Sequence, residues 1–310
     1  MKMEHIVIVD FGSQYTQLIA RRIRESGVYS VIVPPSKAVQ SITSRTKGIV
    51  LSGGPASVYD SNAPDISPDI FKKDIPVLGI CYGMQIMAYK MDGSVEKSNK
   101  REYGRAALDM KTDNPLFDSI PDNSIVWMSH SDRVTQVPSG FEIIGRSENT
   151  EAGAVYNSEK NIYGLQFHPE VVHTVHGRQM LSNFVHRICD CRASWSPESF
   201  VKKKIEEIKD RYPEGNIISG ISGGVDSTVA TEMVHRAAGE RLKCFMIDTG
   251  LLRYREGEKT VELLREKTGL DIELIDASDR FIDALAGVTD PEKKRKIIGQ
   301  VFIQEFEKEA

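Results

Sequence analysis

The sequence predicts an α/β protein of two domains, the first built on a mixed open sheet and the second on a parallel sheet. Two observations support this fold class. Short apolar segments alternate with helical patterns along most of the chain, an order typical of parallel strands covered by helices. The composition changes in a polar stretch near Ala193, so we expect domains over residues 1–193 and 194–310. The length of 310 residues is enough for two hydrophobic cores.

The first domain opens with apolar segments of strand length, separated by turns and an amphipathic helix. The predicted strands are His5–Val9, Tyr29–Val33, Ile49–Leu51 and Val77–Ile80. After Lys97 the pattern changes to short strands and turns, which we interpret as an antiparallel extension of the sheet. Its predicted strands are Arg105–Met110, Ser124–Met128, Phe141–Ser147, Ala152–Tyr156 and Ile162–Phe167. Ligands of such sheets bind beyond the carboxyl ends of the parallel strands.

A cysteine follows the fourth strand, in the segment Gly-Ile-Cys-Tyr-Gly-Met-Gln that continues into a helix. The glycines on either side, Gly79 and Gly83, allow a sharp turn and a close substrate approach. A helix start also stabilises negative charge on a nearby side chain. The pattern predicts a nucleophile elbow with Cys81 as the nucleophile, although a lone cysteine is more commonly a small buried side chain.

A base and a carboxylate end a later apolar strand, in the segment Gln-Phe-His-Pro-Glu. His168 can take the proton of a thiol, and Glu170 can orient the imidazole. In the segment Leu-Ser-Gly-Gly-Pro, the backbone N–H of Gly54 can bind the oxyanion of an acyl intermediate together with that of Tyr82. We therefore expect Cys81, His168 and Glu170 to be catalytic.

These three motifs together resemble the class I (triad-type) glutamine amidotransferases, over roughly the first 190 residues. The resemblance implies that the cysteine attacks the side-chain amide of glutamine, forms a glutamyl thioester and releases ammonia. It also implies that glutamine is bound by Gln85, by Tyr103 in a loop at 101–104, and by a loop at 129–132 with Ser131 and Asp132. By sequence alone, each of these loops has the pattern of an ordinary polar turn.

In the second domain, a helix that begins at Pro197 is predicted to bury its apolar residues Val201, Ile205, Ile208 and Tyr212. A strand from Asn216 then leads into a loop rich in Gly and Ser at the start of another helix. Such a loop presents several hydrogen-bond donors to a phosphate group. It lacks the lysine of a Walker A loop.

The segment Ser-Gly-Gly-Val-Asp-Ser in this loop resembles the signature of the ATP pyrophosphatases, also called N-type or PP-loop enzymes, whose domain is of the adenine-nucleotide alpha-hydrolase-like type. The resemblance implies cleavage of ATP between the α and β phosphates, with Mg²⁺ bound with ATP. The implied ATP and pyrophosphate ligands are Ser222, Gly223, Gly224, Val225, Asp226, Ser227, Thr228 and Asp248. Asp226 is also the candidate Mg²⁺ ligand.

The last predicted helix begins at Pro291 with Asp290 as its cap. Its first turns contain four basic residues, Lys293, Lys294, Arg295 and Lys296. Cations are unfavourable at a helix start, which suggests an anionic partner. A glutaminase followed by a PP-loop resembles the GMP synthetase family, as do the segments Asp-Thr-Gly-Leu-Leu-Arg and Lys-Arg-Lys-Ile-Ile-Gly. The resemblance implies amination of adenylated XMP, with Arg295 in contact with XMP or pyrophosphate.

In that family a dimerisation domain follows and completes the XMP site, whereas this sequence ends eleven residues after Gly299. We therefore expect the second domain to be incomplete and the homodimer of the family to depend on a part not included here. Two alternatives stay open: a PP-loop amidotransferase with a different adenylated substrate, and a fragment or pseudoenzyme that binds nucleotide without completing synthesis.

Composition narrows the possible partners and the compartment. A net charge of −4 gives no support for nucleic acid or a membrane surface as a partner. The four cysteines show no disulfide or zinc spacing, which fits a reducing compartment. With no apolar run of membrane-spanning length and no signal-like N-terminus, we expect a cytoplasmic protein.

Overall fold

A computed structural model describes residues 3–309, apart from the side chains of residues 98–101. The chain forms two compact units, Met1–Ser196 and Pro197–Ala310. Each unit is described by itself below.

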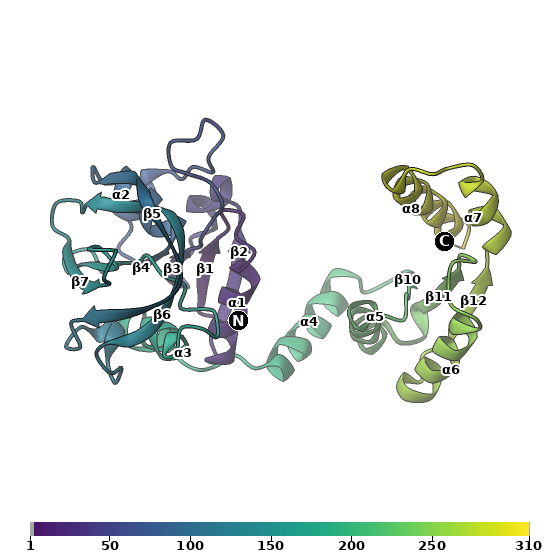
Figure 1. Ribbon diagram of the computed structural model, residues 1–310. Helices are drawn as coiled ribbons and strands as arrows, with labels where there is room; N and C mark the ends of the chain where they lie inside the picture. The colour runs from purple at the N-terminus through teal and green to yellow at the C-terminus, as the bar shows by residue number, and fades with distance from the viewer. Residues whose placement is uncertain (1–2, 310) are drawn as a thin grey trace. The chain divides into compact units, whose positions relative to one another are not determined.

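The first unit is organised around a nine-stranded sheet with the strand order β2-β1-β3-β4-β9-β8-β7-β5-β6 (Figure 1). The strands are β1 (His5–Val9), β2 (Tyr29–Val33), β3 (Thr46–Leu51), β4 (Val77–Ile80), β5 (Ser94–Met110), β6 (Ser124–Gln136), β7 (Glu142–Arg146), β8 (Ala154–Asn157) and β9 (Ile162–Leu165). The five strands from β2 to β9 in this order are parallel, and the remaining pairs are antiparallel. The predicted mixed sheet with an antiparallel extension is confirmed.

The register of the parallel strands brings their carboxyl ends to one edge. Val9 of β1 pairs with Leu51 of β3, Leu51 pairs with Gly79 of β4, and Ile80 pairs with Leu165 of β9. The segments that follow β1, β3, β4 and β9 therefore meet at this edge, which is where ligands of such sheets bind.

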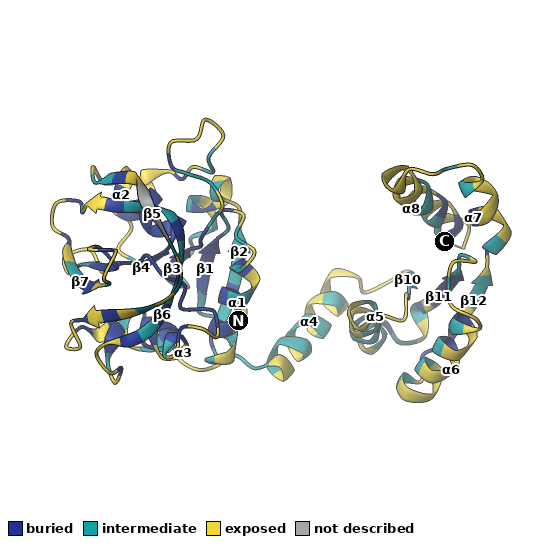
Figure 2. Cartoon of the chain, viewed as in Figure 1, coloured by how far each residue is buried: buried dark blue, intermediate teal, exposed yellow. Residues whose placement is uncertain are grey.

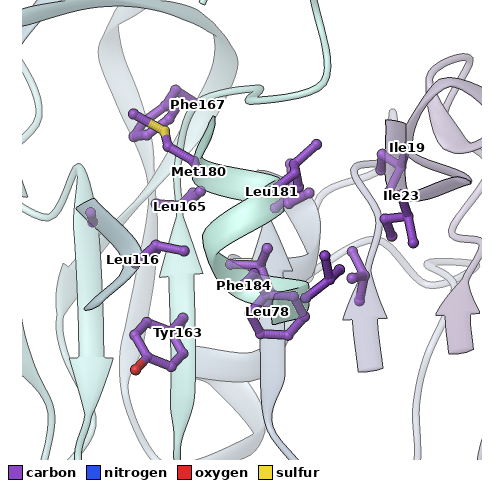
Figure 3. Packing of buried hydrophobic residues seen from close by; sticks show 14 of the residues in the cluster. Ile19, Ile23, Leu78, Leu116, Tyr163, Leu165, Phe167, Met180, Leu181 and Phe184 are labelled. Carbon is purple, nitrogen blue, oxygen red and sulfur yellow. The ribbon is translucent and has the colours of Figure 1, made fainter. Parts of the chain in front are cut away.

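Helices cover both faces of the sheet because its strands are apolar on both sides. Helix α1 (Thr16–Glu25) and helix α3 (Gly177–Asn183), which continues as a π-helical turn (Phe184–Ile188), pack on one face, and α2 (Tyr82–Lys90) packs on the other. Figure 3 shows side chains of α3 and its continuation between the strands and α1: Met180, Leu181 and Phe184 beside Leu78, Tyr163, Leu165, Ile19 and Ile23. Figure 2 shows the strands of this unit largely buried. Short 3₁₀ turns lie at Pro35–Lys37, Val39–Ser41, Pro68–Lys72 and Pro115–Phe117.

The predicted loops at 101–104 and 129–132 are wrong, because both segments lie inside strands. They belong to the long antiparallel pair β5 and β6, although the side chain of Arg101 is outside the described residues. Along β6, buried and half-buried residues alternate from Ser124 to Val134. This period of two is a strand pattern that continues through the polar residues.

The second unit contains a three-stranded parallel sheet of order β10-β11-β12 with helices around it (Figure 1). The elements are α4 (Pro197–Arg211), β10 (Ile217–Gly220), α5 (Val225–Ala238), a 3₁₀ turn (Gly239–Arg241), β11 (Leu242–Asp248), α6 (Glu256–Thr268), β12 (Ile272–Asp276), α7 (Ser278–Leu285) and α8 (Pro291–Lys308). β10 begins one residue after Asn216, where the sequence predicted the start of a strand. That this unit is a PP-loop domain stays a prediction.

Two predictions about helices in this unit have different outcomes. The cap of α8 is confirmed, since the Asp290 carboxylate accepts a hydrogen bond from the Lys293 N–H at 2.8 Å and Pro291 is the first residue of the helix. The expected burial along α4 is wrong: Val201, Ile205 and Ile208 are half-buried and Tyr212, just after the helix, is exposed. Helix α4 packs against α5, and this contact leaves its apolar residues only half-buried. None of the helices described in the structure has the length and apolar character required to span a bilayer.

Candidate active site

Cys81 occupies a sharp turn between β4 and α2. Its backbone has φ 52° and ψ −109°, a conformation that is strained for a residue with a side chain. The Cys81 N–H donates to the Leu165 carbonyl of β9 at 2.7 Å, which ties the turn to the sheet. The glycines beside it are required by close packing: a Cβ on Gly83 would overlap the Leu51 carbonyl, and one on Gly79 would lie 2.8 Å from the Gly83 backbone. The Gly-x-Cys-x-Gly pattern therefore reflects the space available at this turn.

His168 lies beside the cysteine and in front of a buried carboxylate. A Cβ placed on Gly53 would be 3.1 Å from His168 Cε1 and 3.8 Å from Cys81 Cβ, so both side chains border the same small space. His168 Nδ1 is 2.8 Å from Glu170 Oε1, and the Glu170 side chain is buried completely. The His168 backbone is held by a hydrogen bond from its N–H to the Trp127 carbonyl at 3.0 Å.

Burial disfavours a charge on His168, but hydrogen bonds with Cys81 and Glu170 outweigh it and raise the pKa of His168 from its ordinary value of 6.5 to about 11. The imidazole is therefore a stable acceptor for a proton from the cysteine. This is the arrangement of a nucleophile, a base and an orienting carboxylate.

The predicted oxyanion hole adjoins the cysteine. Gly54 follows β3, and a Cβ at this position would lie 2.8 Å from the Phe11 carbonyl oxygen, so only glycine fits there. Tyr82 is the first residue of α2, where backbone N–H groups have no acceptor within the helix. Gly54 lines the same cavity as Cys81, and Tyr82 follows Cys81 in the chain, whereas the role of their amides in binding an oxyanion stays a prediction.

A cavity of about 510 Å³ opens at this edge of the sheet. Cys81 and His168 line it, as do all four residues predicted to bind glutamine, namely Gln85, Tyr103, Ser131 and Asp132. The Gln85 amide group is already engaged, since its Nε2 donates to the Asp132 carbonyl at 2.7 Å. The structure therefore brings these residues together around the cysteine, whereas their contact with glutamine stays a prediction.

Sequence reasoning missed residues that lie close to the catalytic group. Ser13 and Tyr15, in the turn after β1, also line the cavity, and the Tyr15 ring lies edge-on to His168 with 5.4 Å between centroids. Arg22 of α1 is buried, and its Nε donates to the Glu170 carbonyl at 3.1 Å. The position of Ser13 and Tyr15 after a parallel strand was the one available signal. Arg22 is part of a helix rich in arginine, and nothing in its sequence distinguishes it.

In the second unit, the Gly- and Ser-rich loop connects β10 to α5. Gly223 has a φ of +78°, which favours glycine, and Gly224 precedes the first residue of the helix. Hydroxyl groups brace the turn: Ser222 Oγ lies 3.1 Å from Ser227 Oγ, and Thr228 Oγ1 donates to the Gly224 carbonyl at 2.9 Å. Residues 222–226 of the loop are exposed, which a loop that binds a phosphate group requires.

The structure places the charged residues predicted to bind ATP, Mg²⁺ or XMP on different elements of this unit: Asp226, Asp248 and Arg295. Asp226 is exposed in the first turn of α5, and Asp248 ends β11 at the same edge as the loop, where its Oδ1 accepts from the Gly250 N–H at 2.9 Å. Arg295 is on the exposed surface of α8 and pairs with Glu292 at 2.6 Å. Among the described residues, no group of three or more His, Cys, Asp or Glu is arranged to hold a metal ion by itself. The exposed carboxylate of Asp226 suits Mg²⁺ that arrives with phosphate, since this ion keeps several waters and needs few protein ligands.

Residues 7–188 match the family described as Glutamine amidotransferase class-I, so the chain belongs to the class I glutamine amidotransferases. Within that class, the chain is similar to GMP synthase (glutamine-hydrolyzing) of Brachyspira hyodysenteriae, with 48% identity over 99% of this chain and 60% of the relative. It is 49% identical to the protein of the same name from Aquifex aeolicus, over 100% of this chain and 61% of the relative. The chain thus spans about 60% of the length of these curated relatives.

Solved structures agree with this assignment. A Thermoplasma acidophilum protein described as one of the subunits of a GMP synthase is 29% identical, with a TM-score of 0.53 over 66% of this chain and 99% of that one. A glutamine amidotransferase of Thermotoga maritima shares the fold, with 20% identity and a TM-score of 0.50 over 61% of this chain and 100% of that one. The resemblance of roughly the first 190 residues to the class I glutamine amidotransferases is confirmed.

Proposed function

We propose that this chain hydrolyses the side-chain amide of glutamine at Cys81 and that the released ammonia aminates XMP, which ATP has adenylated, to give GMP. The first part of this proposal, glutamine hydrolysis, rests on the cavity at the sheet edge. Cys81 and His168 both line this cavity, and Glu170 Oε1 lies 2.8 Å from His168 Nδ1.

In the glutaminase reaction, His168 holds, as an imidazolium, the proton that it has taken from the Cys81 thiol, and the sulfur attacks the amide carbon of glutamine. The carbonyl oxygen becomes an oxyanion that the N–H groups of Gly54 and Tyr82 stabilise. As the carbon–nitrogen bond breaks, His168 returns the proton to the leaving ammonia. Water, deprotonated by the same imidazole, then hydrolyses the thioester and releases glutamate.

The second half rests on the relatives and on the loop after β10. Relatives that match nearly the whole chain are named GMP synthase, and their match extends through the second unit. Ser222, Ser227 and the backbone around Gly224 would bind the pyrophosphate part of ATP, and Asp226 would hold Mg²⁺. The bound Mg²⁺ would neutralise phosphate charge. Ammonia displaces AMP from the adenylated XMP, and pyrophosphate is the other product.

Glutamate release from glutamine, with and without ATP and XMP, tests the proposal. Cys81→Ala abolishes glutamate release, because no other group can form the thioester. It leaves any amination driven by added ammonium salts unchanged. Cys244→Ala, which removes a buried cysteine of β11, is the matched control and retains glutamate release. Glutamate release that survives in Cys81→Ala would rule out the assigned nucleophile.

A further inference from the structure

One buried histidine in the wall of the glutamine cavity has no part in the mechanism above. His130 lies on β6, and its side chain is only 2% exposed although the residue borders the cavity. Its Nδ1 is 3.0 Å from the carbonyl oxygen of Asp132, two residues along the same strand. Because a carbonyl can only accept, Nδ1 carries the hydrogen of this bond.

The strand needs such support at this point. β6 is the last strand of the sheet, so a neighbour pairs with it on one side only. That pairing is irregular here: His130 is opposite Glu102, Asp132 is opposite Lys97, and the register shifts between Lys97 and Glu102. The backbone of Ser131 and Asp132 is therefore not fixed by a regular ladder.

Two side chains converge on the Asp132 carbonyl instead. Gln85 Nε2 donates to it from α2 at 2.7 Å, and His130 Nδ1 donates to it from the strand itself at 3.0 Å. These bonds fix the segment whose residues Ser131 and Asp132 line the cavity. Such clamping of an otherwise irregular wall is how a binding site is preorganised.

A carboxylate faces the other side of the imidazole. His130 Nε2 makes no hydrogen bond and lies 3.6 Å from Glu102 Oε2, on the facing strand. Glu102 accepts hydrogen bonds from Ser147 Oγ at 3.1 Å and Thr150 Oγ1 at 2.5 Å, in the turn between β7 and β8. Burial opposes its charge, but His130 and these hydroxyls hold the pKa of Glu102 below its ordinary value.

We propose that His130 is a positioning residue for glutamine: facing Glu102 with its Nε2, it fixes the Asp132 carbonyl through its Nδ1 and with it the cavity wall formed by Ser131 and Asp132. The inference rests on the proposed function and deepens it. His130 does not touch the reacting atoms, so its loss weakens substrate binding and spares the reactivity of Cys81.

Two substitutions separate this role from simple packing. In His130→Asn the amide nitrogen occupies a position close to that of Nδ1 and keeps the bond to the Asp132 carbonyl. In His130→Gln the amide nitrogen corresponds to Nε2 and loses that bond. His186→Gln is the matched control, because His186 also contacts two backbone carbonyls, those of Cys191 and Ser26, at 2.9 and 3.0 Å, and does not line the cavity.

The measurement is the rate of Cys81 alkylation in the full chain by two reagents. The diazoketone analogue of glutamine carries the α-amino and α-carboxylate groups. Its alkylation rate saturates as its concentration rises, so the measurement gives a half-saturating concentration of the analogue. Iodoacetamide lacks these groups and reports the thiol alone. One lost hydrogen bond corresponds to a change of roughly threefold to tenfold in binding.

We expect His130→Gln to raise the half-saturating concentration of the analogue by roughly threefold to tenfold. For His130→Asn and His186→Gln, we expect this concentration to stay within about twofold of the wild-type value. Iodoacetamide rates stay unchanged in all three. Equal effects of the Asn and Gln variants, or a half-saturating concentration unchanged in His130→Gln, overturn the inference.

If His130→Gln does not fold, Glu102→Gln replaces it with the same expectation, and an unchanged half-saturating concentration in that variant overturns the inference. A wild-type chain that the analogue does not label would contradict the proposed function instead.

Discussion

At the scale of the residue, the candidate catalytic group contains one strained backbone position, at Cys81, and one buried carboxyl group, at Glu170. The positive φ of Cys81 aims its side chain at the cavity while its N–H stays bonded to β9. Glu170 is fixed through its backbone by Arg22 and through its carboxylate by His168. Strain and buried charge are both costly, and a folded scaffold maintains them where function requires them.

The pKa of His168 leads to a prediction about pH. Its folded-state value of about 11 lies above the ordinary 6.5, so the proton stays bound through neutral pH and is lost as the pH approaches 11. Release of ammonia needs that proton, so activity falls on the alkaline side as His168 deprotonates. Glu170→Gln removes one of the groups that raise this pKa, and we expect the alkaline fall to move to lower pH. Initial rates of glutamate release between pH 6 and 11 would measure the shift, and an unmoved alkaline limb would contradict the role given to Glu170.

The sequence could predict the site residues that belong to short local motifs, and it could not predict those that act through distant contacts. Cys81, His168 and Gly54 each stand at the end of a strand inside a short motif, so strand ends at one sheet edge predicted that they meet. His130, Glu102 and Arg22 act through contacts that join distant strands and a helix. No local pattern encodes those contacts, since they depend on the register of β5 with β6 and on the packing of α1.

At the scale of the element, the elbow requires α2 to start directly against β3. The packing at Gly83 makes a prediction about stability. Gly83→Ala places a methyl group on the Leu51 carbonyl, and we expect the free energy of unfolding of the first unit to fall by about 1–3 kcal/mol. Denaturant unfolding followed by tryptophan fluorescence would measure it, since both tryptophans of the chain, Trp127 and Trp195, belong to this unit.

A second glycine provides the contrast for this prediction. Gly299 lies within α8, and a Cβ there would meet no atom within 4 Å. Gly299→Ala should therefore raise the stability of its unit by about 0.5–1 kcal/mol, the ordinary gain of alanine in a helix. If both substitutions had the same effect, the close packing of the elbow would not be the reason for its glycines.

Strands and helices were predictable where apolar periodicity was strong, as in β1, β4 and α1. The prediction failed at 129–132, where polar residues continue a strand. Ser129, His130 and Asp132 have a turn-like composition, but their alternation in burial follows the strand, because a cavity and a buried carboxylate replace the apolar core at that point. Burial along α4 was overestimated because its sequence shows an apolar stripe and does not show what covers it.

At the scale of the whole molecule, the chain forms two compact units, and the proposed function assigns a different chemistry to each. The proposal therefore predicts that each can be lost separately. Asp226→Ala should weaken binding of Mg-ATP by roughly tenfold or more, since it removes a charged ligand, while glutamate release without nucleotide stays unchanged. Equilibrium binding of ATP in the presence of Mg²⁺ would measure the first effect.

Asp279→Ala is the matched control, because Asp279 is likewise an exposed acid in the first turn of a helix, α7, outside the loop after β10. It should leave ATP affinity unchanged. Equal ATP affinities of the Asp226 variant, the Asp279 variant and the wild type would remove the support for a phosphate-binding loop.

The central claim is that Cys81 is a nucleophile for glutamine. Its most direct test is to incubate the chain with the diazoketone analogue of glutamine and to locate the adduct by mass spectrometry of its peptides. We predict a single adduct on the Cys81 sulfur that excess glutamine prevents from forming. No adduct at Cys81, or one whose formation glutamine does not slow, would contradict the claim.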